Sequence, residues 1–257
     1  MNVRLSGLLG GIGLAAAACT TTPTEPERNT DPYASMSPSD IYVQMGVQYM
    51  EQGKFEIADA DLRHAIELDD DNSEAYNALG VLYDRLKRDR DSRAYFDKAI
   101  SLKPDNYSAR NNYGRFLCSR GAYQDGMAQF QKVIAAPLYG QPWIPLTNAG
   151  LCAKNTGHGR EAEQYFRDAL QRNPAFAPPL LEMAKISLAS RQYLPARGFL
   201  QRYHAVAADT PDSLWTGVQT EVALGADDNA RIYRDRLKKQ FPDAAETRKA
   251  ERYGRLD

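Results

Sequence analysis

The strongest constraint on the fold of this chain is a pattern of small residues that recurs every 34 to 36 positions. The first small residue of each unit is Gly46, Gly80, Gly114, Gly150 or Ala184. Twelve positions later stand Ala58, Ser92, Gly126, Ala162 and Ala196, with Ala230 continuing the series, and four further on come Leu62, Phe96, Phe130, Phe166 and Leu200. A fixed period of this length is typical of stacked helical hairpins, so we expect a repeat protein rather than one globular core.

The order of small and bulky residues in each unit resembles the tetratricopeptide repeat, in which small residues let two antiparallel helices approach closely. We therefore expect an all-α fold, a right-handed tetratricopeptide superhelical solenoid of about six hairpins over residues 38–244. The repeats are assigned to residues 39–72, 73–106, 107–140, 143–176, 177–210 and a degenerate unit at 211–244. Residues 245–257 are expected to form a charged C-terminal tail. No run alternates apolar and polar residues as a half-buried strand would.

Residues 1–18 differ in composition from the repeats. Arg4 precedes an uncharged run from Leu5 to Ala18, which is too short to span a bilayer because a spanning helix needs about 20 residues. A basic start, a short apolar middle and small residues before Cys19 are typical of an export signal. The segment resembles a bacterial lipoprotein leader, which implies cleavage before Cys19 and lipidation of that cysteine. The alternative is ordinary cleavage at the same bond, which releases a soluble protein with a free thiol.

Residues 19–37 are assigned to the lipidated N-terminus and a flexible tether. This stretch is rich in Thr, Pro and Glu and has almost nothing to bury, which is typical of a solvated linker. By resemblance to Gram-negative sorting rules, Thr20 rather than Asp after the cysteine implies the outer membrane, with the protein on its periplasmic face.

Composition and motifs argue against catalysis. The formal net charge is -1, and no basic stripe marks a nucleic-acid partner. The 3 histidines lie in different repeats without the spacing that a helical metal site needs. No phosphate-binding glycine loop or nucleophile elbow is present. We therefore expect a binding protein with no catalytic residue, metal, cofactor or small-molecule substrate.

The first helix of each hairpin lines the concave wall of such a solenoid, which is the usual binding surface. Groove-facing positions of the first three repeats supply the candidate partner-binding residues: Val43, Val47, Met50, Asn77, Val81, Asn111 and Arg115. The first three form an apolar stripe on the outermost repeat, suited to a partner helix or extended segment. Alternatively, the tether or the second repeat covers this stripe.

Cys118 and Cys152 fall on the first helices of adjacent repeats. Because those helices pack side by side, a disulfide between them is sterically possible, and an oxidising compartment favours it. Two separately buried thiols that act as small apolar fillers are the alternative.

Two stretches, Asn111–Cys118 and Pro137–Cys152, resemble the outer-membrane lipoprotein pilotins of type IV pilus biogenesis and stability, the PilW/PilF-like family. The resemblance implies a non-enzymatic adaptor, lipidated at Cys19. Such an adaptor binds secretin subunits and promotes their outer-membrane localisation and multimerisation, which links it to twitching motility. A general tetratricopeptide scaffold for the assembly of other outer-membrane proteins is the alternative.

Overall fold

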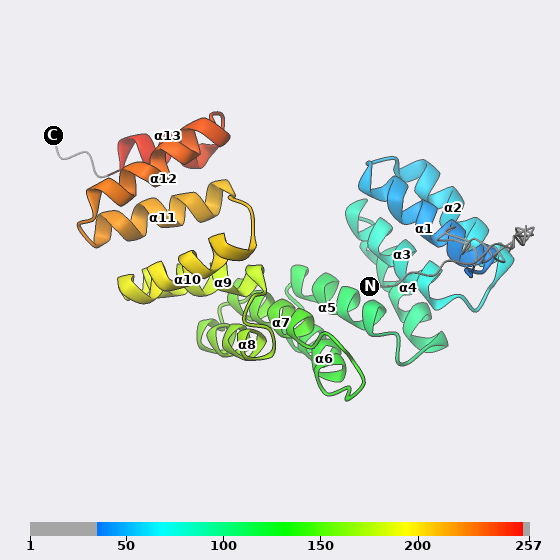
Figure 1. Ribbon diagram of the computed structural model, residues 1–257. Coiled ribbons are helices and arrows are strands. Elements are labelled where there is room, and N and C mark those ends of the chain that lie inside the picture. The colour runs from blue at the N-terminus through cyan, green and yellow to red at the C-terminus, as the bar shows by residue number, and fades with distance from the viewer. Residues whose placement is uncertain (1–34, 254–257) are drawn as a thin grey trace, which may run out of the picture. The chain divides into compact units, whose positions relative to one another are not determined.

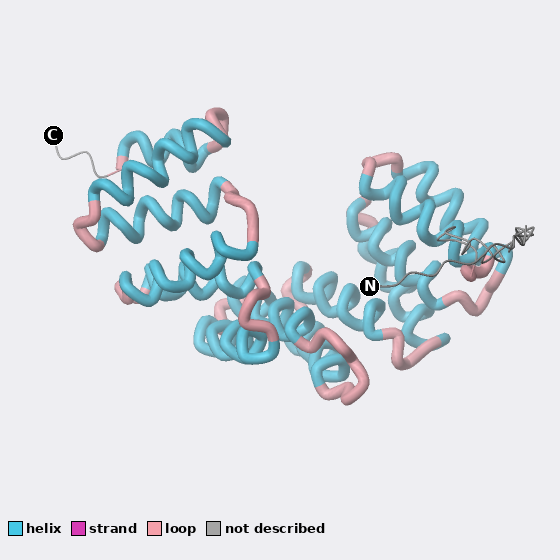
Figure 2. Tube along the Cα trace, in the orientation of Figure 1, coloured by secondary structure: helices cyan, strands magenta, loops and turns pink. Residues whose placement is uncertain are grey.

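The computed structural model describes residues 35–253, and this part of the chain consists of thirteen α-helices without a strand (Figure 1, Figure 2). The helices are α1 Pro38–Glu51, α2 Phe55–Leu68, α3 Ser73–Arg85, α4 Asp89–Leu102, α5 Tyr107–Ser119, α6 Tyr123–Ile134, α7 Trp143–Asn155, α8 Gly159–Arg172, α9 Ala177–Ala189, α10 Tyr193–Val206, α11 Pro211–Ala223, α12 Asp227–Gln240 and α13 Ala245–Arg252. The leader, Cys19 and almost all of the tether lie outside the described residues, so their assignments stay predictions.

The first twelve helices pair in chain order into six hairpins. Each helix packs most extensively against its hairpin partner, and the second helix of one hairpin also contacts the first helix of the next. First helices touch one another directly as well, in the pairs α1 with α3, α3 with α5, α5 with α7, and α9 with α11. The expected all-α solenoid of about six helical hairpins is therefore confirmed.

Glycine lets the two helices of a hairpin pack in near contact. A Cβ atom on Gly114 would lie 2.6 Å from Phe130 Cε1, closer than carbon atoms pack, so the ring occupies the space that a larger residue would need. The same pairing recurs in three other hairpins: Gly46 with Leu62, Gly80 with Phe96, and Gly150 with Phe166. All four bulky partners are buried, with at most 1% of their surface exposed.

The sixth hairpin keeps this close approach with a shift of one residue. Its pair is Gly217 and Tyr233, and a Cβ atom on Gly217 would lie 2.6 Å from the tyrosine ring. A fixed period of 34 residues predicts a bulky apolar residue at position 234, but that residue is Arg234. The arginine instead donates to the backbone carbonyls of Ala250 and Tyr253, which fixes the segment after the hairpin.

Residues 245–252, assigned from the sequence to a charged tail, form helix α13 on the last hairpin. Thr247 and Ala250 are buried, and α13 contacts both α11 and α12. These two residues stand three positions apart and so share one face of the helix, which gives an otherwise charged segment a side that can pack. The packed face explains why the helix continues the stack.

Buried polar side chains fix each hairpin relative to the next. Asn72 caps α3 by accepting from the backbone amides of Glu74 and Ala75, and its Nδ2 donates to Ser39 Oγ at 2.8 Å. Ser39 Oγ in turn donates to the carbonyl of Ala65 at 2.8 Å. Asn106 repeats the arrangement one hairpin later. Because a buried polar group without a partner is costly, the network disfavours other registers between hairpins.

The replacement Gly114→Ala should destabilise the protein, because the new methyl group must displace the buried Phe130 ring. Overpacking of this kind costs about 1–3 kcal/mol. Gly198→Ala is the matched control, since Gly198 lies within α10 and, apart from its chain neighbours and its own helix backbone, no atom lies within 4 Å of the added carbon. We expect the control to keep or raise the urea midpoint, because alanine is the better helix former. Equal midpoints for Gly114→Ala and wild type would contradict this packing account.

Candidate functional site

A small cavity lies on the first helices of the first two repeats, with Asn112 of α5 at its border, and is called here the apolar cavity. Its volume is about 190 Å³, and its lining includes five of the seven predicted partner-binding residues: Val43, Val47, Met50, Asn77 and Val81. Ala78 adds a further apolar surface, while Glu51, Glu74, Arg85 and Asn112 complete the lining. The structure therefore brings together side chains from α1 and α3 that are distant in sequence.

The apolar stripe on α1 is half covered. Met50 is only 3% exposed and belongs to the core cluster with Leu62 and Leu79, so it forms the floor of the cavity rather than its accessible rim. Val43 and Val47 pack against the same cluster but stay partly exposed. The second repeat thus covers part of the stripe and leaves the two valines as its reachable portion.

A second cavity, called here the polar cavity, lies on α3, α5 and α7 and has a volume of about 340 Å³. Its lining comprises Val81, Asp84, Arg85, Phe96, Asn112, Arg115, Cys118, Ser119, Asn148, Leu151, Cys152 and Asn155. Val81, Arg85 and Asn112 line both cavities. The two cavities therefore form one groove that runs across the first four repeats.

Asparagine amides bridge neighbouring repeats along this groove. Asn112 Nδ2 donates to Asn77 Oδ1 at 3.1 Å, and Asn148 Nδ2 donates to Asn111 Oδ1 at 2.9 Å. The predicted residues Asn77 and Asn111 thus serve as acceptors between repeats, and Asn77 is only 6% exposed. Asn112 and Asn148 line the polar cavity and were missed from the sequence. Each stands one position after a position that the repeat pattern predicts to face the groove. Their place next to Asn111 and Thr147 is the sequence feature that could have indicated them.

Two arginines in the polar cavity have no carboxylate partner within residues 35–253. Arg115 is exposed, and Arg85 donates through one guanidinium nitrogen to the backbone carbonyl of Met50 at 2.9 Å. The one lining carboxylate, Asp84, lies 2.8 Å from Arg120, which also contacts Asp89 at 2.6 Å. Neither arginine therefore forms an ion pair within residues 35–253, although Glu51 and Glu74 line the adjoining apolar cavity together with Arg85.

Cys118 and Cys152 are joined by a disulfide that forms part of the polar cavity. Their Cα atoms are 5.4 Å apart, and the bond links α5 to α7 across 34 positions of sequence. Gly126 faces Cys118 Sγ closely and leaves no room for a Cβ atom of its own. Of the two arrangements left open by the sequence, this structure has the bonded one.

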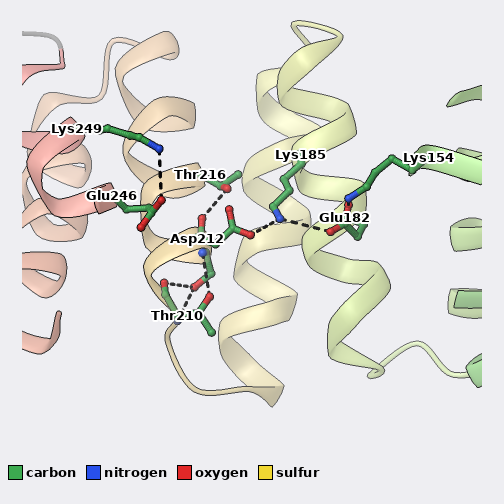
Figure 3. Close-up of polar contacts among 9 residues, drawn as sticks. Lys154, Glu182, Lys185, Thr210, Asp212, Thr216, Glu246 and Lys249 are labelled. Atoms are coloured by element: carbon green, nitrogen blue, oxygen red, sulfur yellow. Dashed lines mark hydrogen bonds and ion pairs between the residues drawn. The ribbon is translucent and has the colours of Figure 1, made fainter. Parts of the chain in front are cut away.

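An ion-pair ladder links α7, α9 and α11 in the C-terminal half (Figure 3). Glu182 accepts from Lys154 at 2.7 Å and lies 3.4 Å from Lys185, which also contacts Asp212. Burial alone would lower the pKa of Lys185, but the two carboxylates outweigh it and hold that pKa above its usual value. Lys185 therefore stays charged and paired.

A third cavity, of about 640 Å³, lies beside this ladder on α9, α11 and α13. Trp215 and Tyr253 form part of its wall and meet edge to face, with ring centroids 5.1 Å apart. Lys249 in the same wall lies 3.4 Å from Glu246 (Figure 3). The charges of both lysines in the wall are therefore already compensated.

Within residues 35–253, no three acidic, histidine or cysteine side chains lie close enough to hold a metal ion. In the same part of the chain, every helix is too short or too polar to cross a membrane.

This chain is similar to known proteins both in its repeats and over nearly its whole length. Tetratricopeptide repeat profiles match residues 43–106, 90–139 and 145–176. The type IV pilus assembly protein PilF of Pseudomonas aeruginosa is 26% identical over 246 residues, which are 96% of this chain and 97% of PilF. The structure of P. aeruginosa PilF matches with a TM-score of 0.72 at 26% identity, covering 83% of this chain and 96% of that one.

The structure of PilW, a widely conserved type IV pilus biogenesis factor, also matches with a TM-score of 0.72. It is 31% identical, and the match covers 83% of this chain and 98% of PilW. A tetratricopeptide repeat protein from Parabacteroides merdae shares the fold alone, with a TM-score of 0.61 at 13% identity.

Replacing both Cys118 and Cys152 with serine should lower the free energy of unfolding by about 2–4 kcal/mol, the range typical of a native disulfide. Thermal melting with and without a reductant measures the effect. The wild-type midpoint should fall when the reductant is added, whereas the double variant should melt at the lower temperature in both conditions. Identical melting of oxidised wild type and double variant would show that the bond adds no stability.

Proposed function

Since this chain belongs to the tetratricopeptide-repeat family of type IV pilus biogenesis proteins, we propose that it is a non-enzymatic pilotin. In this proposal it is an outer-membrane lipoprotein that binds secretin subunits and promotes their outer-membrane localisation and multimerisation. The observation that carries the proposal is the continuous groove on the first four repeats, which offers both apolar and polar contacts on a rigid helical wall.

The apolar cavity supplies the main attraction for a secretin segment. Val43, Val47 and Val81 are partly exposed there, above a floor that includes Met50. Covering about 150 Å² of apolar surface would contribute roughly 4 kcal/mol at 25 cal/mol per Å², before the cost of ordering the partner. This contribution suits a subunit that is captured and later handed over to an assembly.

Lipidation at Cys19 would act together with the groove. Each buried methylene of an acyl chain contributes about 0.8 kcal/mol to membrane binding, so several chains hold a protein on the membrane. Confinement to the membrane raises the effective concentration of any captured subunit beside its site of assembly. The residues between Cys19 and Ser37 supply the reach of the tether.

The lipid anchor can be tested with Cys19→Ser in cells. The variant should disappear from the outer-membrane fraction and should no longer incorporate radiolabelled palmitate, because serine offers no thiol for acylation. Gln48→Ser is the control and should fractionate as wild type, because Gln48 is exposed. If Cys19→Ser still sediments with the outer membrane, the lipid anchor is wrong.

The groove can be tested with a double variant, Val43→Ser and Val47→Ser. Loss of two partly buried aliphatic side chains from the contact should weaken secretin capture about tenfold, which corresponds to about 1.4 kcal/mol. Co-purification from detergent and the amount of secretin multimer are the measurements. Gln44→Ser with Gln48→Ser is the matched control, because both glutamines are exposed on the same helix.

Three outcomes separate the proposals. Normal secretin capture by the valine variant would remove the apolar cavity from the contact. Failure of the wild-type protein to recover secretin would contradict the pilotin role. Recovery of other outer-membrane assembly components in its place would favour a general envelope scaffold.

A further inference from the structure

We infer that the polar cavity binds the side-chain carboxylate of an acidic residue in an extended partner segment, with a neighbouring apolar residue of that segment in the apolar cavity. The inference deepens the proposed function, because it concerns the same groove, but it requires only that the groove binds a peptide and not that this peptide belongs to a secretin.

The charge of the polar cavity selects an acid. Arg85 and Arg115 come from adjacent repeats and line one cavity of about 340 Å³, and neither contacts a carboxylate within residues 35–253. The lining carboxylate of Asp84 is already held by Arg120. A guanidinium binds a carboxylate through charge-assisted hydrogen bonds, which are stronger than neutral ones. A partner carboxylate would therefore form ion pairs with these two arginines.

The amides of the polar cavity select an extended backbone. The bonds to Asn77 and Asn111 orient the Asn112 and Asn148 side chains and leave each amide with a free carbonyl oxygen and a second N–H. Asn155 adds an exposed amide to the same lining. An extended peptide presents unpaired backbone N–H and C=O groups, whereas a helix satisfies its own except at its ends. The amide row therefore fits an extended segment better than a helix.

Because the two cavities share lining residues, a single partner segment can place its acidic residue in the polar cavity and its apolar residue in the apolar cavity. Val81, Arg85 and Asn112 belong to both, so a chain that lies in the polar cavity continues directly over the apolar one.

The third cavity, on α9, α11 and α13, does not offer two unpaired cations. Its lysines, Lys185 and Lys249, already contact carboxylates, which leaves Arg191 as its one lining cation without such a contact within residues 35–253. The polar cavity therefore differs from it in having two lining arginines, Arg85 and Arg115, that form no ion pair within the described residues.

Selection from random peptides displayed on phage tests the inference without reference to a secretin. The full chain, purified in detergent, is immobilised, and the peptides are joined to the coat protein at their C-terminal ends so that no free carboxyl terminus is offered. We expect the enriched peptides to share an aspartate or glutamate close to an aliphatic residue. A synthetic copy of the best peptide should bind about tenfold more weakly when its acid is replaced by the matching amide.

Arg85→Gln and Arg115→Gln, separately and together, locate the contact. For these variants the acidic peptide should lose affinity, and the acid and its amide should bind almost equally well. Arg172→Gln is the matched control, since Arg172 is exposed at the end of α8 and lines none of the three cavities. It should retain the full preference for the acid.

Enriched peptides without a shared acid, a failure to enrich any peptide, or an acid preference that survives both arginine replacements would each overturn the inference. The pilotin role stands or falls separately, through co-purification of the secretin with the same wild-type protein. A melting temperature for each arginine variant shows whether a loss of binding reflects a loss of fold.

Discussion

The contact between a glycine on one helix and a bulky side chain on its hairpin partner is the interaction on which the rest of the structure depends. Gly114 against Phe130 shows the principle, because the missing Cβ allows a ring to sit between two backbones that would otherwise be held apart. Close approach sets the angle of each hairpin, and equal hairpins present their first helices at equal intervals. The groove is therefore a consequence of packing inside the hairpins, and Phe96, which packs against Gly80, also lines the polar cavity.

The repeat pattern also determines which features of the structure could be predicted from the sequence. The hairpins were predictable because Gly80, Gly114 and Gly150 make the same close contact in successive repeats, so the sequence pattern recurs several times. What varies between units was less accessible: the Asn112 and Asn148 amides stand one position away from the repeat consensus, and the Gly217 pair is displaced by one residue. Met50 fitted the groove pattern, but its burial depends on the neighbouring hairpin, which periodicity does not describe.

The groove changes in chemical character along its length. Over α1 and α3 it is lined by aliphatic side chains above a buried floor, and towards α5 by Arg85 and Arg115, which form no ion pair within the described residues. From α7 to α11, the lysines Lys154 and Lys185 are paired with the carboxylates of Glu182 and Asp212 (Figure 3). One helical architecture thus presents successive surfaces that differ in what they can bind.

Helix α13 lies at the C-terminal end of the stack of hairpins and covers the last one. A last hairpin without a neighbour leaves exposed an apolar face that the next hairpin covers elsewhere in the stack. Here Thr247 and Ala250 close that face, Arg234 secures the closing segment, and the helix turns its charged remainder to water. A protein so terminated keeps a defined length, and its binding surface keeps a defined number of positions.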